Sequence, residues 1–437
     1  MKKSLIVVLS LFFVLGLAVP VVVHAADETP AVAKGDTKIT LGGEIRLRCE
    51  FKKNVLDFDD DIAGGKGGSY GTATTTDNYA AYDQRIRLHL QADVSPNTMG
   101  FIQLESGDLN TSDTYTWGSP DEGATGNVGG TLGNAKRGDL RILQVWIQHK
   151  GSGLLGTPAG IKVGHMPIKL GNGLFLDHSK YGDDAILLFA DPTKELHVAL
   201  AHVKFNEGAT TSTGMPVATA GNDDDNAYSL LFDYKMNGIN FGGDVLYGDL
   251  QDFSNPTGTQ TEPLHFWNFG LRGDTTVAGL KLYADLEVQT GKAKRAYDDP
   301  NNAAATDIDR KYKGYAWMVG GNYTVSDVTL GLETAYGSGD KIDGSKAVAD
   351  SGAKNESFVT SLGADPHYTY VYEYRAPSAA GTPGTGSNTV HTTGTGLANT
   401  WYIKASASAK PMKDLTAALS LYYLRAAKGV AIMGATN

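Results

Sequence analysis

The sequence has little of several features that would place it in common protein classes. Cys49 is its single cysteine, so no intrachain disulfide can form, and it has no C-x-x-C-H motif for covalently attached haem. After residue 25 there is no apolar run of about 20 residues, so we expect no transmembrane helix. The net charge of −10 argues against nucleic acid as a partner.

Signatures of catalysis and cofactor binding are also missing. No Ser-His-Asp set with a G-x-S-x-G nucleophile elbow is present, so a lipase-like or protease-like activity has little support. His and Asp residues are scattered without the spacing of a metal site. We therefore predict a protein that is not an enzyme and that needs no cofactor or metal.

The N-terminus carries an export signal. Lys2 and Lys3 precede an apolar run from Leu5 to Val19, and a small-residue pattern ends at Ala25. This arrangement predicts a signal peptide over residues 1–25, with an uncleaved membrane anchor as the alternative. Cleavage removes both lysines, which takes the net charge to −12. Residues 26–37 lack periodicity, and we expect a flexible periplasmic leader there.

The rest of the chain alternates between apolar and polar residues with period two. In residues 42–51, Ile45, Leu47 and Phe51 fall on one side and charged residues on the other, which is the pattern of a β-strand. The same alternation recurs, for example in residues 84–93, 226–236, 279–289 and 327–336. Fifty-four glycines suit an all-β chain with many turns.

The connections between these segments alternate between short and long. Short ones follow Asp93, Phe189, Tyr234, Asp274, Tyr323 and Ala409, whereas long ones cover residues 52–80, 107–138, 206–226, 249–264, 291–314 and 337–397. Short turns at one end and long loops at the other are typical of a bacterial outer-membrane β-barrel. A soluble β-sandwich is the alternative, but its faces carry only scattered charge.

We therefore predict a transmembrane antiparallel β-barrel over residues 38–437. The pattern gives about 15 strands, whereas single-chain barrels have even counts. The odd count predicts that the barrel is incomplete at its C-terminus. Tyr315 and Tyr323 share one face eight residues apart, which is about 26 Å along a strand and roughly 20 Å along the membrane normal after tilting. This distance approaches the roughly 25 Å band that two aromatic girdles bound in such barrels.

Several segments of the first half resemble outer-membrane porins of the alginate-export type. They are LGGEIRLRCEF, YDQRIRLHLQADVSP with FIQLES, LRILQVWIQH, IKVGHMPIKLGNGLFLDHSKYGDDAI and HVALAHVKF, between Lys38 and about Phe205. The resemblance implies an 18-stranded barrel and an arginine-lined path for anions. This chain would then lack about three of the 18 strands. This chain also places acidic residues on the polar face, so a general porin is the safer expectation than an alginate channel.

The alternation predicts which residues line the pore. On the polar face we expect Glu44, Arg46, Arg48, Arg85, Arg87, His89, Lys281, Asp285 and Glu287. Two roles fit the four arginines. They could form cross-strand ion pairs with Glu44, Glu50, Asp83 and Asp93, or they could attract anionic solutes. The two roles are compatible.

A glycine-rich stretch, GNGLFLDHSKYGDDA, follows one strand at the long-loop end. It predicts a candidate constriction made by Asp177, His178, Lys180, Asp183 and Asp184. An ordinary external loop is the alternative placement. Two acidic runs, Asp57–Asp61 and Asn222–Asn226, fall in expected external loops, where they are solvated or bind divalent ions shared with lipopolysaccharide.

The expected function is that of an outer-membrane porin, a water-filled channel for passive diffusion of small or anionic hydrophilic solutes. The expected partners are outer-membrane lipid and lipopolysaccharide, the solutes themselves and the barrel-assembly machinery. The alternative is a scaffold barrel that sheathes a periplasmic multihaem cytochrome in an electron conduit. Such a scaffold would share the strand pattern and the polar interior.

Overall fold

The computed structural model describes most of the predicted strands and few of the long connections between them. It describes residues 21–24, 31–34, 37–52, 79–107, 115–116, 139–153, 156–179, 181–206, 224–254, 261–295, 308–339, 354–362, 396–413 and 415–428. The chain divides into two compact units, Met1–His149 and Lys150–Asn437.

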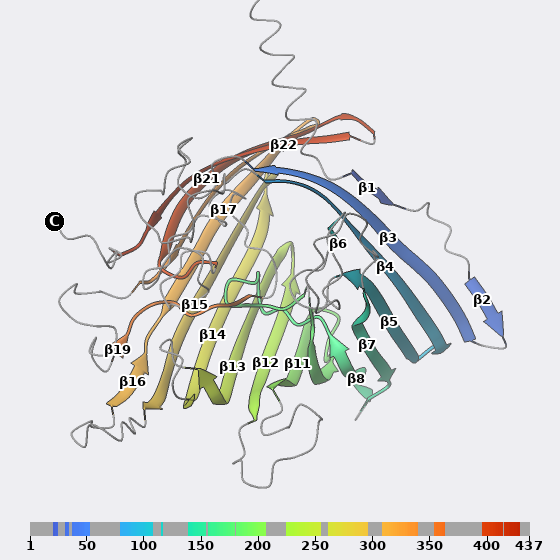
Figure 1. Ribbon diagram of the computed structural model, residues 1–437, viewed down its shortest axis with the longest axis horizontal. Coiled ribbons are helices and arrows are strands. Elements are labelled where there is room, and N and C mark those ends of the chain that lie inside the picture. Colours follow the sequence, from blue (N-terminus) through green and yellow to red (C-terminus); the bar gives the residue numbers. More distant parts are fainter. Residues whose placement is uncertain are drawn as a thin grey trace, which may run out of the picture. The chain divides into compact units, whose positions relative to one another are not determined.

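The first unit is an antiparallel sheet built around three hairpin-linked strands (Figure 1). Its strands are β1 (Val21–His24), β2 (Ala31–Lys34), β3 (Thr37–Lys52), β4 (Tyr79–Ser95), β5 (Thr98–Gly107), β6 (Tyr115–Thr116) and β7 (Asp139–Gly151). β3 pairs with β4, β4 with β5, and β5 with β7. β1 also pairs with β3, although its residues belong to the predicted signal peptide, whose cleavage stays a prediction.

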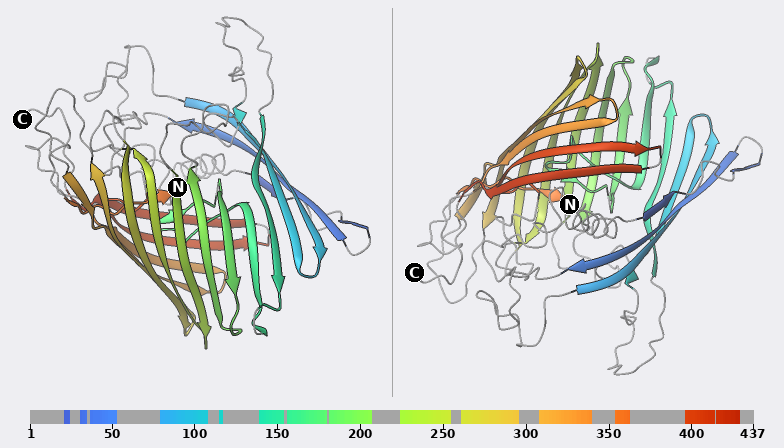
Figure 2. Two further views of the ribbon diagram at one scale, coloured as in Figure 1. Left: turned by 90° about the horizontal axis from the view of Figure 1, so that it is seen from below. Right: turned by 90° about the horizontal axis from the view of Figure 1, so that it is seen from above.

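The second unit is a longer antiparallel meander. Its main strands are β8 (Ala159–Met166), β10 (Asp183–Ala190), β11 (Leu196–Asn206), β12 (Asp225–Met236), β13 (Ile239–Ser254), β14 (Thr261–Val277), β15 (Leu280–Arg295), β17 (Tyr315–Val325), β18 (Val328–Gly337), β21 (Thr400–Met412) and β22 (Leu415–Ala426). Each pairs with the next. Figure 2 shows their direction turning steadily along the meander, so that this sheet is curved.

Four short strands accompany this meander. β9 (Leu176–Asp177) pairs in parallel with β20 (Ser361–Leu362), and β16 (Ile308–Tyr312) pairs with β15 and with β19 (Lys354–Asn355). The first pair lies outside the main sheet and joins two segments that are almost 200 residues apart in the sequence. Without β1, β2, β6 and these four, the described residues form 15 strands of eight residues or more, as many as the alternation predicts.

Tight turns close the short ends of the hairpins. Asn237 and Gly238 connect β12 to β13 with φ angles of 47° and 82°, and Ala278 and Gly279 connect β14 to β15 with 49° and 81°. Positive φ at both central residues is the type I′ turn, whose twist matches that of the two strands. The opposite ends carry the long connections, most of which lie outside the described residues. The segregation of short and long connections is therefore confirmed.

The two faces of the sheets differ in chemistry, as the alternation predicts. In β15, Leu282, Leu286 and Val288 are exposed on one face, whereas Asp285 and Glu287 are buried on the other. Tyr315 and Tyr323 are both exposed on the apolar face. An exposed apolar face on consecutive strands needs an apolar environment to cover it.

Among the described residues, no helix is long and apolar enough to cross a membrane. The described elements are all strands, and the prediction of an all-β antiparallel fold is confirmed. The acidic run Asp57–Asp61 lies outside the described residues. Of the other run, Asp224 forms an ion pair with Lys204 at 2.8 Å.

Candidate functional site

The polar face of the first unit carries a row of cross-strand ion pairs. Arg85 on β4 binds Glu44 on β3 at 2.6 Å, and Arg87 binds Glu105 on β5 at 2.6 Å. Glu105 is fully buried and also lies 3.6 Å from the Arg141 guanidinium of β7. Because a buried carboxylate needs a charged partner, Arg87 has a structural role here.

The remaining predicted residues of this unit lie on the same face. Arg46 and Arg48 alternate with exposed Leu47 on β3 and have interactions of their own. His89 stacks on Phe101 with ring centroids 5.7 Å apart, and Phe101 stacks in turn on Trp146 at 5.2 Å. A Cβ atom on Gly42 would meet the His89 ring at 2.4 Å, so the glycine makes room for the imidazole.

In the second unit, the stretch that the sequence singles out as a constriction folds back onto the polar face of the sheet. Residues 171–179 and 181–183, here called the inward segment, lie between β8 and β10 and include Asp183, the first residue of β10. Leu174, Phe175 and Leu176 are buried, and the Phe175 ring stacks on Phe266 of β14 with centroids 5.7 Å apart. The segment therefore packs on the polar face of the sheet, and its role as a constriction stays a prediction.

Asn172 ties the start of the inward segment to β15. Its backbone N–H donates to Oδ2 of Asp285 at 3.2 Å, and its side-chain amide donates to the same oxygen at 2.8 Å. Gly171 has a φ angle of +55°, and a Cβ atom there would lie 3.3 Å from Asp285, 3.6 Å from Glu287 and 3.7 Å from Arg272. A side chain at this position would therefore press on a group of buried charges.

These charges form a cluster across four strands, β12 to β15. Arg272 of β14 donates to Asp244 of β13 at 3.0 Å and to Asp233 of β12 at 2.7 Å. Asp244, Asp285 and Glu287 are each at least 97% buried, and Glu287 accepts from Asn268 at 2.7 Å. The predicted pore-lining residues Asp285 and Glu287 thus lie on the polar face, but the inward segment covers them and they are not open to solvent.

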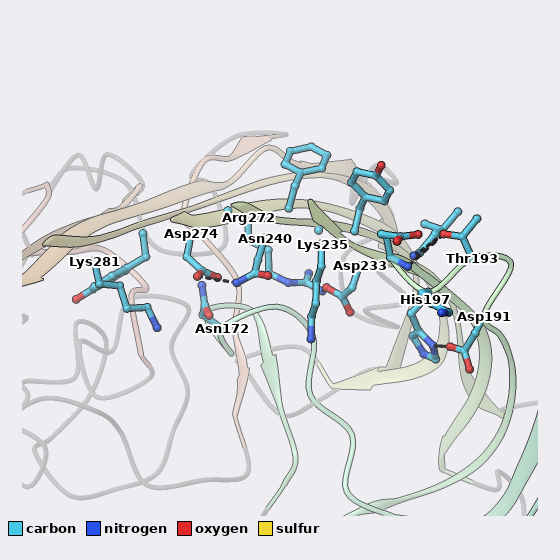
Figure 3. A pocket seen from close by; sticks show the side chains of 18 of the residues that line it. Asn172, Asp191, Thr193, His197, Asp233, Lys235, Asn240, Arg272, Asp274 and Lys281 are labelled. Atoms are coloured by element: carbon cyan, nitrogen blue, oxygen red, sulfur yellow. Dashed lines mark hydrogen bonds and ion pairs between the residues drawn. The ribbon is translucent and has the colours of Figure 1, made fainter. Parts of the chain in front are cut away.

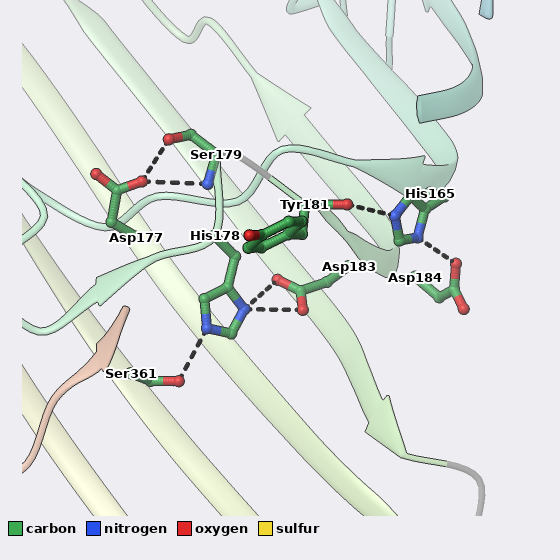
Figure 4. Close-up of polar contacts among 8 residues, drawn as sticks. All are labelled: His165, Asp177, His178, Ser179, Tyr181, Asp183, Asp184 and Ser361. Carbon is green, nitrogen blue, oxygen red and sulfur yellow. Dashed lines mark hydrogen bonds and ion pairs between the residues drawn. The ribbon is translucent and has the colours of Figure 1, made fainter. Parts of the chain in front are cut away.

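His178 ties the end of the inward segment to a segment more than 180 residues away (Figure 4). Its Nδ1 lies 2.8 Å from Asp183, and its Nε2 lies 2.9 Å from the Ser361 hydroxyl. Next to it, β9 pairs with β20, and the Ser361 N–H donates to the Phe175 carbonyl at 2.8 Å. Two remote segments are therefore held together over the polar face.

The structure separates the five residues of the predicted constriction. Asp177, His178 and Asp183 belong to the inward segment and its contacts. Asp184 does not, because it follows Asp183 on strand β10 and alternation turns it to the opposite face, where it contacts His165 at 2.9 Å. Lys180 lies outside the described residues.

A cavity of about 1080 Å³ lies between the inward segment and the short turns (Figure 3). Two of its four acidic residues are in ion pairs or hydrogen bonds with basic groups: Asp233 with Arg272, and Asp191 with Lys150 and His197. Asp274 accepts from the neutral Asn240 amide, and Glu195 has no ion-pair partner among the described residues. Three lysines line it, Lys194, Lys235 and the predicted Lys281. Within the described part of the chain these lysines have no ion-pair partner. Three such cations against the carboxylates of Glu195 and Asp274 leave the wall of the cavity with a small excess of positive charge.

Two carboxyl groups outside the long strands, those of Asp191 and Asp177, have shifted pKa values. A hydrogen bond from His197, helped by Lys150, lowers the pKa of Asp191 below its ordinary value. Burial raises the pKa of Asp177, but hydrogen bonds from Ser179 and Lys169 outweigh it, so the net shift is downward. Both groups are therefore anionic at neutral pH.

Sequence reasoning missed Arg272, Asp233 and Asp244, which organise the buried cluster. The signal was present, because Asn268, Arg272 and Asp274 alternate with Trp267, Phe269 and Leu271 on β14. Nothing in the sequence indicated the meeting of His178 with Ser361. In the described part of the chain, no group of three or more His, Cys, Asp or Glu side chains could hold a metal ion.

Comparison with known proteins gives similarity of fold at low sequence identity. No protein-family model and no curated protein sequence matches the chain. Among solved structures, OccK8 (OprE) of Pseudomonas aeruginosa is similar at 12% identity and a TM-score of 0.46 over 89% of this chain and 84% of that one. Pseudomonas putida OprB is similar at 13% identity and a TM-score of 0.40 over 89% of both chains. P. aeruginosa OccK2 (OpdF) in complex with glucuronate is similar at 11% identity and a TM-score of 0.44 over 89% of this chain and 80% of that one. Similarity this low identifies no functional residue.

Proposed function

We propose that the protein is an outer-membrane porin that forms a water-filled channel for passive diffusion of small hydrophilic solutes, anionic ones included. One observation carries the proposal: the inward segment lies across the polar face of a meander whose other face exposes Leu282, Leu286 and Val288. A sheet that is apolar outside and polar inside suits a barrel in lipid. A segment packed on the polar side narrows such a barrel and makes it selective by size.

The proposal includes the finer expectations from the sequence. The protein is exported through a cleaved signal peptide, is inserted by the barrel-assembly machinery and lies among outer-membrane lipid and lipopolysaccharide. It belongs with the alginate-export type, whose resemblance covers the strands that carry Arg46, Arg48, Arg85 and Arg87. Its solutes are small because the inward segment leaves a narrow path.

A mild anion preference follows from the charges that are not compensated. In the cavity Asp191 and Asp233 contact basic groups, whereas Lys194, Lys235 and Lys281 have no ion-pair partner among the described residues and outnumber the remaining acids, Glu195 and Asp274. Solute ions respond to wall charges nearby, because charges in distant loops are screened over about 8 Å at physiological salt. The mature net charge of −12 therefore does not decide the selectivity.

The scaffold alternative is less well supported. A barrel that sheathes a cytochrome must leave its interior open for a partner protein. The inward segment instead packs Phe175 on Phe266 and bonds Asn172 to Asp285. Inserting a partner there would have to break these contacts.

The test is electrical. The purified protein is reconstituted in planar bilayers under a salt gradient, and we expect stepwise conductance with a reversal potential on the anion side. The triple variant Lys194→Gln, Lys235→Gln, Lys281→Gln should move the reversal potential toward cations. Its matched control, Lys410→Gln with Lys413→Gln, removes exposed cations at the β21–β22 turn and should leave it unchanged. Folded protein without any conductance would contradict the porin assignment.

A further inference from the structure

The contact of His178 with Asp183 and Ser361 does more than hold two segments together. Asp183 places both carboxylate oxygens within 2.9 Å of Nδ1, and the Ser361 hydroxyl lies 2.9 Å from Nε2 (Figure 4). The side chains of His178 and Asp183 are 17% and 9% exposed. A serine, a histidine and an acid in this order of contact have the arrangement of a nucleophile, its base and the group that orients the base.

The carboxylate fixes which ring nitrogen carries the proton. Because Asp183 can only accept, Nδ1–H donates to it, and Nε2 of the neutral ring is left with its lone pair. The Ser361 hydroxyl then donates to Nε2, which is the polarity that a serine nucleophile requires. The absence of a G-x-S-x-G elbow does not weigh against this, since a triad is recognised by geometry and roles.

We propose that Ser361 is a nucleophile for acyl transfer, with His178 as its general base and Asp183 as a positioning residue, and that small carboxylic esters entering the channel are its substrates. The Phe205 ring lies edge-on to His178 with centroids 5.7 Å apart and packs against the imidazole. This activity goes beyond passage of solutes, and only the route by which the ester reaches Ser361 rests on the proposed channel.

The reaction balances without any further reactant except water. Ser361 Oγ bonds to the ester carbonyl carbon while its proton passes to His178 Nε2. The carbon–oxygen bond to the alcohol breaks, and the alcohol leaves with that proton. Water then attacks the acyl-serine, its proton passing through Nε2 back to Oγ, and the carboxylic acid is released.

The chain contains matched comparison groups. His165 also contacts an acid, Asp184 at 2.9 Å, but its Nε2 faces the Tyr181 carbonyl oxygen and no hydroxyl. Ser179 is in the inward segment, but its hydroxyl donates to Asp177 and contacts no histidine. Neither arrangement can activate a serine, so both serve as controls.

The experiment uses the full-length protein in detergent with a fluorophosphonate probe and p-nitrophenyl acetate. We expect covalent labelling that mass spectrometry maps to Ser361, and release of p-nitrophenol. Ser361→Ala should abolish both, and His178→Gln should slow both by about 100-fold or more. Ser179→Ala and His165→Gln should keep them. Asp183→Asn should slow release and change its dependence on pH, which loss of a purely structural contact would not do.

Two results would overturn the proposal. One is absence of labelling at Ser361 in protein whose folding is shown by heat-modifiable migration and conductance. The other is labelling that Ser361→Ala and His178→Gln leave unchanged, which would place the reactive group elsewhere. Bilayer conductance of Ser361→Ala separates the two functions: a conducting but unreactive variant retains the porin function and loses only the acyl transfer.

Discussion

At the scale of single residues, Gly171 controls how closely the inward segment approaches the buried cluster. Its φ of +55° would cost any other L-residue roughly 1–2 kcal/mol. A Cβ atom added at this position would also contact Asp285, Glu287 and Arg272. We therefore expect Gly171→Ala to loosen the segment and raise single-channel conductance. Gly156→Ala is the control, because Gly156 has a φ of +79° with nothing within 4 Å. Equal conductance in both variants would contradict this role of Gly171.

Asp191 gives a prediction on pH. Its pKa is lowered in the folded protein by the hydrogen bonds from His197 and Lys150, so these contacts stabilise the fold fully above the unfolded-state pKa near 3.8. That stabilisation is lost as the pH falls through the lower, folded-state value. Asp191→Asn should reduce thermal stability at neutral pH, and the difference from the parent should shrink below about pH 4. The group is partly exposed, so the effect is small. Melting curves from pH 3 to 8 measure it, and a difference that grows in acid would contradict the assignment.

At the scale of strands, the alternation in β15 predicts opposite responses to charge on its two faces. Leu286 lies near the middle of the strand and is 43% exposed on the apolar face. Leu286→Arg should cost about 2–4 kcal/mol in lipid, whereas Lys281→Glu, on the polar face, should leave the free energy of unfolding almost unchanged. Urea unfolding from lipid vesicles measures both. Similar losses on both faces would contradict the placement of the sheet in a membrane.

A hairpin turn offers a change in the stabilising direction. Ala278 has a φ of 49° in the first central position of the β14–β15 turn, where Asn237 stands in the β12–β13 turn. Asparagine tolerates this conformation better than alanine, so Ala278→Asn should stabilise the protein by up to about 1 kcal/mol. The same urea experiment applies, and Asn237→Ala should show the reverse change.

The strands could be predicted from the sequence because period two is a local signal, and the same holds for Arg85 and Arg87 on the polar face. The prediction that Asp184 belongs to the constriction is wrong, because strand β10 begins at Asp183. Alternation along the strand turns Asp183 to the polar face and Asp184 to the opposite face. Contacts such as His178 with Ser361 join residues 183 apart, and no local pattern contains them. The cluster of Arg272 with Asp244 needed strand register, which the sequence leaves open.

At the scale of the whole molecule, the arginines of the first unit decide how far wall charge sets selectivity. Arg85 and Arg87 are committed to Glu44 and Glu105, so part of their charge is cancelled locally. Arg46 and Arg48 on the same face add positive charge to these pairs, and a positive potential there should favour anions because low-dielectric walls focus the field into the pore. Changing Arg46, Arg48, Arg85 and Arg87 together to Gln should therefore move the reversal potential toward cations without abolishing conductance.

The single variants separate the two roles. In Arg87→Gln, fully buried Glu105 keeps only the Arg141 guanidinium, at 3.6 Å, as an ion-pair contact among the described residues. This variant should therefore destabilise the protein more than Arg85→Gln, whose partner Glu44 is 29% exposed. Urea unfolding measures this difference, and bilayer recordings under a salt gradient measure the selectivity. If the quadruple variant keeps the parental reversal potential while Arg87→Gln is destabilised, the arginines only brace the wall, and selectivity resides in the lysines of the second unit.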